Sequence, residues 1–474
     1  MDFLRCLLLV IILPLCYSID AACSNGKCKL DDECSSNGDC GAGLYCFSCP
    51  HGFSGSRCVR SSITDQFKLI NDSLPFNKYA FLTTHNAFAI NGEPSHTGVR
   101  RATLSNQEDS VTQQLKNGVR GLMLDTYDFD GDVWLCHSFR GHCHDFTAFE
   151  PAIDTLKEIA AFLSSNPKEI VTLILEDYVE APKGLTKVFT DAGLVKFWFP
   201  VTRMPKNGGD WPLVSDMVAK NQRLLVFTSV SSKEQSEGIA YQWNYMVENQ
   251  FGDKGRKALK ERSCPNRKES SPLDDKSKSL VLVNYFRTIP LKPISCEDNS
   301  GGLIEMLQTC HGAAGNRWAN FVAVDYYKRS EGGGSFQAVD TLNGKLLCGC
   351  NDVHACVHPN NVIHGRPLCP RQTTHHPNLA KHLEALGGNN MLYGSILVTV
   401  SDPISKRLLI RLCGANQSQT STQDLKQHYP ERVHVKLLRP GRARGSNSGK
   451  PITLATQSSS NKMLVVFTSS WMIV

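Results

Sequence analysis

The chain has 474 residues, of which 41% are hydrophobic and 20% are charged, so it is long enough for one large globular domain and smaller additional parts. Its net charge of +6 is mild for this length and permits attraction to anionic lipid surfaces. This charge balance does not indicate a nucleic-acid partner.

Residues 1–21 are predicted to be a secretory signal peptide. Arg5 precedes an apolar run at 6–16, which is too short to span a bilayer, and small residues follow. Loss of this segment leaves 17 of the 19 cysteines, and in a secreted chain most of them should form disulfides. The odd number predicts at least one thiol that is free or paired between chains. Glycosylation sequons at Asn71 and Asn416 agree with a secreted glycoprotein.

Residues 22–60 are predicted to form a small disulfide-rich module. Seven cysteines lie between residues 23 and 58, with almost no aliphatic periodicity between them. So short a segment cannot bury a core and needs cross-links. Its end, Cys49 to Cys58, resembles the last loop of EGF-like modules. A zinc site is the competing interpretation, but the signal peptide and the cysteine spacing favour disulfides.

Residues 62–357 alternate strand-like runs with helical patterns, which is typical of a parallel α/β architecture. The predicted strands are Tyr79–Asn86, Val119–Asp125, Val133–His137, Ile170–Asp177, Arg223–Thr228, Leu280–Phe286 and Phe321–Tyr327. An amphipathic helix is predicted over Glu150–Ser165, ended by Asn166-Pro167. Seven strands with short connections predict a closed or nearly closed TIM-type (β/α) barrel.

Several of these strands end in polar residues. They are His85-Asn86, Asp125, His137, Glu176-Asp177 and Asp325. In a (β/α) barrel the carboxyl ends of the strands converge on one mouth, where side chains from different strands can act together. The repeated placement therefore predicts an active site at that mouth.

Four ordered segments carry a specific resemblance. Thr84-His85-Asn86, Gly118–Asp125, Cys136-His137 and Leu173–Asp177 resemble the successive motifs of the X domain of phosphatidylinositol-specific phospholipase C. Over residues 23–357 the chain is similar to secreted plant proteins that carry such a domain. The resemblance implies a PLC-like phosphodiesterase barrel and a phosphoric diester hydrolase of lipid metabolism. It also implies an extracellular location in the cell wall or apoplast, with peripheral association with a membrane surface.

The resemblance assigns catalytic roles to three residues. It makes His85 the general base and His137 the general acid that protonates the leaving diacylglycerol oxygen. Histidines suit both tasks because their unperturbed pKa lies near the working pH. Asp325 matches an aspartate that orients the base histidine, and the alternative for Asp325 is a helix N-cap.

The resemblance leaves the charge that stabilises the phosphate open. Asn86, Asp125 and Glu176 match three of four calcium-binding positions, and their oxygens suit a hard cation. The fourth position is Met123, whose thioether is a poor ligand for calcium. A metal-independent branch of the family uses an arginine, which would fall about where Tyr127 stands. Arg120 and Tyr127 are thus the candidate substrate-binding residues, and the cofactor is either weakly bound calcium or none.

Cys136 and Cys143 bracket the loop that carries His137, and a disulfide between them would clamp this loop. A zinc site with His142 and His144 is the alternative, but ligands so crowded rarely close a tetrahedral site.

Residues 358–474 are predicted to be an atypical, largely disordered tail, because they lack domain periodicity apart from a strand-like run at 395–412. An altered reading frame is our hypothesis for this tail.

Two alternatives to a phospholipase C-like enzyme stay open. One is a glycerophosphodiesterase or sphingomyelinase-D-like enzyme, against which Met123 counts because such enzymes need a fuller acid cluster. The other is an inactive barrel that serves as a secreted binding protein.

Overall fold

The computed structural model describes residues 23–356, apart from 50–54, 63, 66, 68–71, 254–262 and 331–332, together with short strands between 362 and 456. The chain divides into two compact units, residues 1–371 and 372–474, and the site described below lies in the first. The predicted signal peptide and both sequon asparagines lie outside the described residues. Among the described helices, none is both long enough and apolar enough to cross a membrane.

The predicted tail at 358–474 is described only as three antiparallel strand pairs. They are β13 (Val362–Ile363) with β14 (Arg366–Pro367), β15 (Ile396–Ser401) with β16 (Arg407–Leu412), and β17 (Glu431–His434) with β18 (Thr453–Thr456). The strand-like run at 395–412 thus contains a hairpin of two strands. The prediction of disorder concerns residues outside the described ones.

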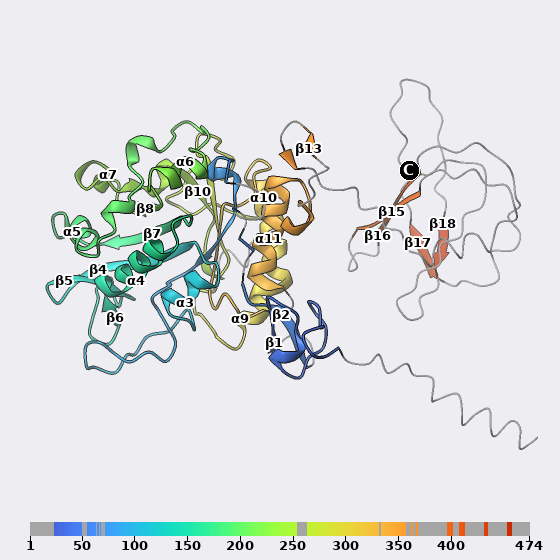
Figure 1. Cartoon of the computed structure of the whole chain (residues 1–474), viewed down its shortest axis with the longest axis horizontal. Coiled ribbons are helices and arrows are strands. Elements are labelled where there is room, and N and C mark those ends of the chain that lie inside the picture. The colour runs from blue at the N-terminus through green and yellow to red at the C-terminus, as the bar shows by residue number, and fades with distance from the viewer. Residues whose placement is uncertain are drawn as a thin grey trace, which may run out of the picture. The chain divides into compact units, whose positions relative to one another are not determined.

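Eight parallel strands form a curled sheet that follows a TIM-type barrel (Figure 1). They are β3 (Phe81–Thr84), β4 (Gly121–Phe129), β7 (Val171–Tyr178), β8 (Leu224–Thr228), β9 (Ala240–Tyr241), β10 (Met246–Glu248), β11 (Leu280–Asn284) and β12 (Phe321–Val324). The sheet order is β10-β11-β12-β3-β4-β7-β8-β9, so the last strand of the barrel pairs with the first. Within the described residues, β9 and β10 do not pair with each other. The predicted barrel is confirmed, with one opening.

Alternating side chains along these strands build two hydrophobic cores. Phe321 and Ala323 of β12 belong to a core inside the barrel, whereas Val322 and Val324 belong to a core between the sheet and the helices. Successive side chains of a strand point to opposite faces, so a strand buried on both faces is apolar at nearly every position. The continuous apolar runs in the sequence follow from this double burial.

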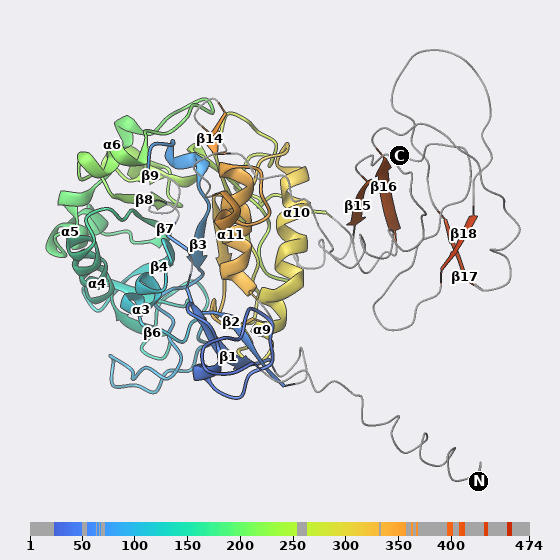
Figure 2. The same cartoon turned by 45° about the vertical axis from the view of Figure 1, so that its right-hand side comes forward.

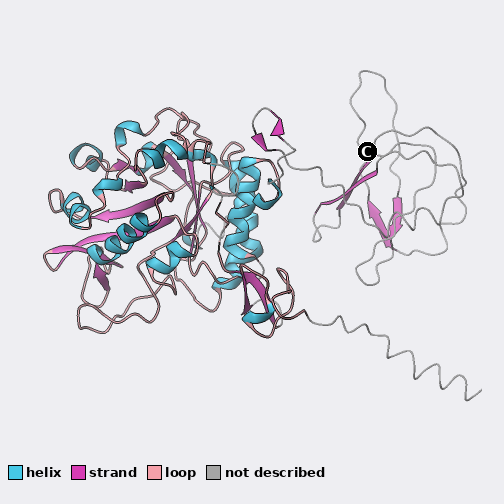
Figure 3. Ribbon diagram, in the orientation of Figure 1, coloured by secondary structure: helices cyan, strands magenta, loops and turns pink. Residues whose placement is uncertain are grey.

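Helices cover the outer face of the sheet (Figure 3). The longer ones are α4 (Ala152–Ser165), α5 (Gly184–Asp191), α10 (Leu303–Ala313) and α11 (Gly334–Leu347), and the shorter ones are α3 (Val111–Lys116), α6 (Val214–Ala219), α7 (Ser232–Ser236) and α9 (Ser295–Glu297). A π-helical turn, η7 (Asp298–Gly302), joins α9 to α10, and α10 packs beside α11 (Figure 2). Single 3-10 turns are η2 (Asn37–Asp39), η3 (Phe76–Lys78), η4 (Val195–Phe197), η5 (Val201–Arg203), η6 (Gln242–Asn244) and η8 (Val353–Cys356).

Two of the predicted elements differ in detail from the structure. The run Val133–His137 is not a barrel strand, because β5 (Asp132–Cys136) turns back antiparallel to β4 and pairs with β6 (Ala148–Pro151). The helix predicted from Glu150 begins at Ala152, because Glu150 and Pro151 still belong to β6. Its end at Ser165 is as predicted.

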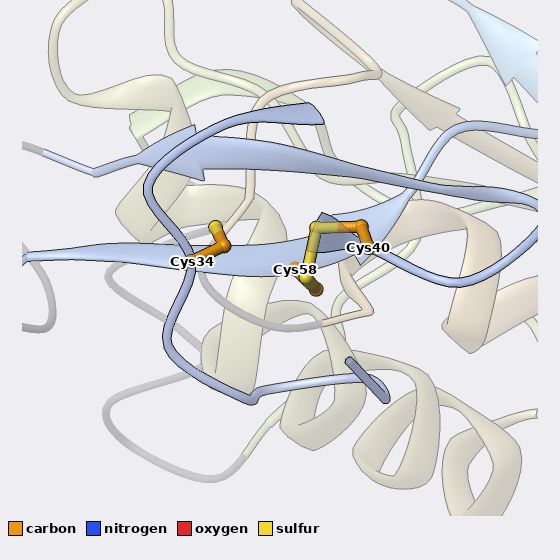
Figure 4. A group of neighbouring side chains, drawn as sticks. All are labelled: Cys34, Cys40 and Cys58. Carbon is orange, nitrogen blue, oxygen red and sulfur yellow. A yellow bond between two sulfur atoms is a disulfide. The ribbon is translucent and has the colours of Figure 1, made fainter. Parts of the chain in front are cut away.

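The N-terminal module is held by disulfides, as predicted. Its hairpin of β1 (Leu44–Ser48) and β2 (Ser56–Arg60) is bonded to the preceding segment by Cys34–Cys46 and Cys40–Cys58, and Cys23–Cys28 cross-links that segment itself. Figure 4 shows the bond between Cys40 and Cys58 with Cys34 beside it. Sulfurs paired in this way are not thiolates, and zinc binds thiolates, so the competing zinc interpretation is wrong here.

The module packs on the barrel. Cys49 forms a disulfide with Cys296 of α9, and the Tyr45 hydroxyl donates to the carbonyl of Lys328, just after β12, at 2.6 Å. Arg60 pairs with the buried carboxylate of Asp340 in α11 at 2.9 Å. Disulfides Cys264–Cys310 and Cys348–Cys356 lie within the barrel domain, and Cys350 is also disulfide-bonded.

Candidate active site

The carboxyl ends of the parallel strands, called the mouth below, bring the predicted polar residues together. Phe81, Met123, Ile174, Met246 and Ala323 face the inside of the barrel. At even spacing after them, Asp125, Glu176 and Glu248 lie in the same strands, and His85 and Asp325 are the first residues after β3 and β12. Because side chains alternate with a period of two, all five polar residues face inward. Five strands therefore contribute one ionisable side chain each to the mouth.

Asp177 does not join this group, because its position in β7 turns it outward. Its carboxylate accepts from Lys233 Nζ at 2.8 Å and from the hydroxyl of Thr228 at 2.6 Å. It is a structural residue of the outer face.

His85 is hydrogen-bonded to Asp325. Nδ1 of His85 lies 2.9 Å from Oδ1 of Asp325, and Asn106 Nδ2 donates to the same oxygen at 2.9 Å. A carboxylate only accepts, so Nδ1 carries the hydrogen and Nε2 keeps the lone pair. The ring of Phe286 stacks on the imidazole with centroids 3.6 Å apart. This arrangement leaves Nε2, which makes no hydrogen bond to a described residue, as the basic nitrogen.

His137 comes from the segment after β5 and lies beside Asn86. Its Nε2 is 2.9 Å from Asn86 Nδ2, and its Nδ1 is 3.0 Å from the hydroxyl of Thr103. An imidazole with its hydrogen on Nδ1 satisfies both contacts. Burial, more than its neighbours His85 and Arg101, lowers the pKa of His137 to about 3. His137 is therefore neutral near pH 7 in this arrangement.

Asn86 reaches His137 through an unusual backbone conformation. Its φ of 43° is left-handed, which asparagine adopts more readily than most residues. The turn brings its amide onto His137 instead of continuing the alternation of β3. Its Oδ1 is buried without a hydrogen-bond partner among the described residues.

Two buried amides hold the backbone beneath the histidines. Gln107 Nε2 donates to the carbonyl of His85 at 2.8 Å. Asn299 Nδ2, in η7, lies 2.9 Å from the carbonyl of Asp325, 3.1 Å from that of Tyr326 and 3.0 Å from that of Arg329. The backbone of Asp325, the first residue after β12, is thereby held by η7.

The residues predicted to bind calcium lie at the mouth, where Glu176 is already paired with an arginine. Asp125 and Glu176 are register partners in β4 and β7. Arg267 Nη2 donates to Glu176 Oε1 at 2.9 Å, and Met123 is buried in the inner core. Burial and the Glu176 carboxylate raise the pKa of Asp125 well above its usual range. Met123 offers no oxygen and Glu176 is already paired with Arg267, so the four positions supply too few free acidic oxygens to fit a calcium ion. Calcium binding itself stays a prediction.

Arg267, Glu248 and Asn284 are mouth residues that sequence reasoning missed. Glu248 accepts from Arg267 Nη1 at 3.2 Å and from Asn284 Nδ2 at 2.8 Å. Arg267 Nε donates to Glu269 at 3.0 Å. The three-residue strand β10 is too short to recognise as a strand, and Arg267 lies in a loop that no motif marks. The apolar run Leu280–Phe286 was the one sequence signal for this part of the mouth, because it contains Asn284 near its end.

Of the two predicted substrate-binding residues, the structure brings only Tyr127 to the mouth. Arg120 precedes β4 at the opposite end of the barrel, where it donates to Glu169 at 2.7 Å and to the carbonyl of Leu115 at 2.7 Å. The prediction that Arg120 binds the substrate is therefore wrong. Tyr127 stacks on Tyr178 with ring centroids 4.5 Å apart.

The predicted disulfide between Cys136 and Cys143 is present and clamps the loop that carries His137. The alternative zinc site is wrong, because both sulfurs are bonded to each other. Beside this loop lies a cavity of about 810 Å³, lined in part by Tyr127, Tyr178 and His142. The loop thus forms one wall of a depression whose lining includes neither His85 nor His137.

Comparison with known proteins finds relatives that share the barrel. A family profile described as PI-PLC X matches residues 76–343. A PI-PLC X domain-containing protein of Arabidopsis thaliana is 57% identical over 348 residues, which are 73% of this chain and 81% of that protein. A PI-PLC X domain-containing protein of Arthroderma benhamiae is 25% identical over 294 residues, covering 57% of this chain and 86% of that one.

Solved structures of lower identity are also similar. The phosphatidylinositol-specific phospholipase C of Listeria monocytogenes has 14% identity and a TM-score of 0.39, over 59% of this chain and 96% of that one. A variant of the Staphylococcus aureus enzyme has 12% identity and the same TM-score, over 58% and 95%. The profile match and the Arabidopsis relative carry the assignment: the chain belongs to the PI-PLC X domain family.

Proposed function

We propose that the chain is a secreted phosphoric diester hydrolase of the phospholipase C kind, which cleaves the headgroup of an inositol phospholipid. The observation that carries this proposal is the hydrogen bond from His85 Nδ1 to Asp325, which leaves Nε2 as a base at the mouth of a PI-PLC X barrel. His137 lies beside the next residue, Asn86, and is the second proton-transfer group.

The proposed reaction uses two proton transfers. Nε2 of His85 takes the proton of the inositol hydroxyl next to the phosphate, and this oxygen forms a new bond to phosphorus. The bond from phosphorus to the diacylglycerol oxygen breaks, and His137 gives that oxygen a proton. The products are an inositol cyclic phosphate and a diacylglycerol. Two histidines on opposite sides of phosphorus can perform both steps near neutral pH.

His137 must gain a proton before it can act as the acid. Burial disfavours its charged form, but a phosphodiester anion beside it would favour that form and raise its pKa. Protonation of His137 and binding of the anionic substrate are therefore expected to support each other, and binding should tighten as the pH falls.

The loops around the mouth support a membrane surface as the place of the reaction. Exposed apolar side chains, between 41% and 56% exposed, are Val99, Leu104, Phe139, Ile289 and Leu291, all on loops near the mouth. Arg100, Arg140 and Lys292 belong to the same loops. Apolar side chains with basic neighbours suit peripheral binding to an anionic membrane. The disulfides fit an oxidising, extracellular location, which we also propose.

A binding protein without turnover is the second candidate. It is favoured by Met123 at a position for an acidic ligand and by the low pKa of His137, since both weaken the catalytic set. The hydrogen bond between His85 and Asp325 opposes it.

Hydrolysis of phosphatidylinositol vesicles and of lysophosphatidylcholine micelles by the purified chain distinguishes these functions. We expect release of inositol cyclic phosphate by the wild type and at least a ~10²-fold lower rate for His85→Ala. The matched control is His96→Ala, an exposed histidine in a loop, which should retain full activity. Turnover of lysophosphatidylcholine alone would support the glycerophosphodiesterase or sphingomyelinase-D-like alternative. No turnover on either lipid would leave the binding protein.

A further inference from the structure

We infer that Arg267 is the fixed cation of the mouth, which stands where a divalent metal would otherwise bind and makes the reaction independent of calcium. The inference rests on the proposed function for its role in phosphate binding. Its claim about calcium does not depend on activity.

The first observation is the set of contacts made by the guanidinium. Arg267 donates through Nη2 to Glu176 at 2.9 Å, through Nη1 to Glu248 at 3.2 Å and through Nε to Glu269 at 3.0 Å. Glu176 is one of the residues predicted to bind calcium. A carboxylate that already holds a guanidinium must lose this partner before it can bind a metal.

The second observation is how firmly Arg267 is placed. Its side chain is 14% exposed, and its Cζ lies 4.9 Å from the ring centroid of Phe251 and 5.4 Å from that of Trp243. Its backbone N–H donates to the carbonyl of Glu248 at 2.9 Å. Three carboxylates pair with the guanidinium, and arginine stays protonated in proteins. The positive charge is therefore permanent.

The third observation is its place relative to the histidines. Phe251, under the guanidinium, stacks on Phe286 with centroids 6.1 Å apart, and Phe286 stacks on His85 at 3.6 Å. His85 and Arg267 thus lie along one aromatic wall of the mouth. These ring contacts make the cation part of the same site as the base.

The fourth observation is the hydrogen-bonding capacity that remains. A guanidinium has five N–H donors, and three of them are used in the contacts with described residues. Two donors and a positive charge suit the non-bridging oxygens of a phosphodiester, whose charge grows during attack on phosphorus. Arginine at this position supplies by a side chain what calcium would supply by coordination.

Calcium titration of the wild type tests the inference without any substrate. Isothermal titration calorimetry and thermal unfolding, with calcium chloride against chelator, should show no binding and no change in melting temperature. The variant Arg267→Gln frees Glu176, so this variant is expected to bind calcium where the wild type does not. Binding of one calcium ion by the wild type, lost in Glu176→Gln, would overturn the inference.

Activity gives a second, independent readout. The wild type should cleave phosphatidylinositol vesicles equally in calcium and in chelator. Arg267→Ala should lower kcat/KM at least ~10²-fold, and added guanidinium ion, but not calcium, should restore part of the loss. The control Arg203→Ala removes an arginine that pairs with Asp216 at the opposite end of the barrel and should retain activity. Full activity of Arg267→Ala would contradict the inference. If the wild type cleaves no phosphodiester, the proposed function fails, and the calcium titration alone decides on Arg267.

Discussion

The hydrogen bond between His85 and Asp325 decides which imidazole nitrogen faces a substrate. Oδ1 of Asp325 receives hydrogens from both His85 Nδ1 and Asn106 Nδ2, and the Asp325 side chain is only 7% exposed. A neutral amide in place of Asp325 could donate to Nδ1 and so favour the opposite tautomer.

Asp325→Asn is therefore expected to lower kcat/KM for phosphatidylinositol by about 10²–10⁴-fold while the fold is retained. Initial rates on vesicles and a circular dichroism spectrum check the two parts of this prediction. Asp216→Asn, at the far end of the barrel, is the control. A fully active Asp325→Asn would show that the carboxylate serves only as a structural group.

His137 predicts a pH dependence of stability. Its pKa is about 3 in the folded chain and about 6.5 in an unfolded one. Between pH 6.5 and pH 3 the His137 imidazole is protonated in the unfolded state but neutral in the folded state, and this difference favours unfolding. The stability that the neutral imidazole contributes is therefore complete above pH 6.5 and is lost as the pH falls toward 3.

The free energy of unfolding of the wild type should therefore fall more steeply between pH 7 and pH 4 than that of His137→Gln. The expected difference is about 2–4 kcal/mol, measured by urea unfolding at each pH. Burial raises the pKa of Glu150 to about 7, so Glu150 makes the free energy of unfolding rise as the pH falls. This effect is the same in the wild type and in His137→Gln and does not change the difference between them. Parallel curves for the two proteins would refute the prediction.

Sequence predicted the two histidines and Asp325, but it missed Arg267. Strand ends converge at the mouth of any (β/α) barrel, which explains His85 and Asp325, whereas His137 reaches the mouth from the segment after the hairpin strand β5. A loop residue such as Arg267 is placed by long-range contacts with Glu176 and Glu248, which local patterns do not record.

At the scale of elements, η7 links the N-terminal module to the hydrogen-bonded pair of His85 and Asp325. Cys296, two residues before η7, is bonded to Cys49 of the module. Asn299 within η7 binds three carbonyls of the segment that begins at Asp325. The turn thus holds Asp325 in place from behind.

Asn299→Ala is expected to lower the free energy of unfolding by about 2–3 kcal/mol, because two buried carbonyls and one partly buried carbonyl lose a donor. It should also reduce kcat/KM at least about tenfold, since Asp325 is then less firmly placed. Thermal or urea unfolding and vesicle assays measure the two effects. Asn166→Ala removes a similar amide-to-carbonyl bond at the end of α4 and should leave kcat/KM unchanged. Equal effects of the two variants on kcat/KM would contradict the role of η7.

The element pattern shows where strand prediction succeeds and fails. Double burial makes barrel strands such as β8 and β11 continuous apolar runs, which are easy to recognise. β9 and β10 have two and three residues, too few to give any periodicity. β5 is apolar because it packs in a hairpin, and only its pairing with β4 and β6 shows that it lies outside the barrel.

At the scale of the whole molecule, the two ends of the barrel expose apolar side chains of similar size, but only one end carries the mouth. Phe139 and Ile289 are 49% and 56% exposed on loops near the mouth. Val195 and Leu213 are 51% and 43% exposed near the opposite end. The proposed function requires that the first pair meet the membrane.

Phe139→Ser with Ile289→Ser is therefore expected to weaken binding to phosphatidylinositol vesicles at least about tenfold, because two side chains no longer enter the apolar interface. Sedimentation with vesicles measures the binding. Val195→Ser with Leu213→Ser is the matched control and should bind as the wild type does. Equal loss of binding in both double variants would show that the mouth has no special role in docking.

The disulfide between Cys49 and Cys296 also sets a constraint on biosynthesis. Its cysteines are 247 residues apart, whereas the three bonds inside the module span 5, 12 and 18 residues. At roughly 5–20 residues per second, about 12–50 s of translation separate Cys49 from its partner. During that time Cys49 lies exposed beside six cysteines that could capture it. Production of this protein in an oxidising compartment should therefore depend strongly on a disulfide isomerase.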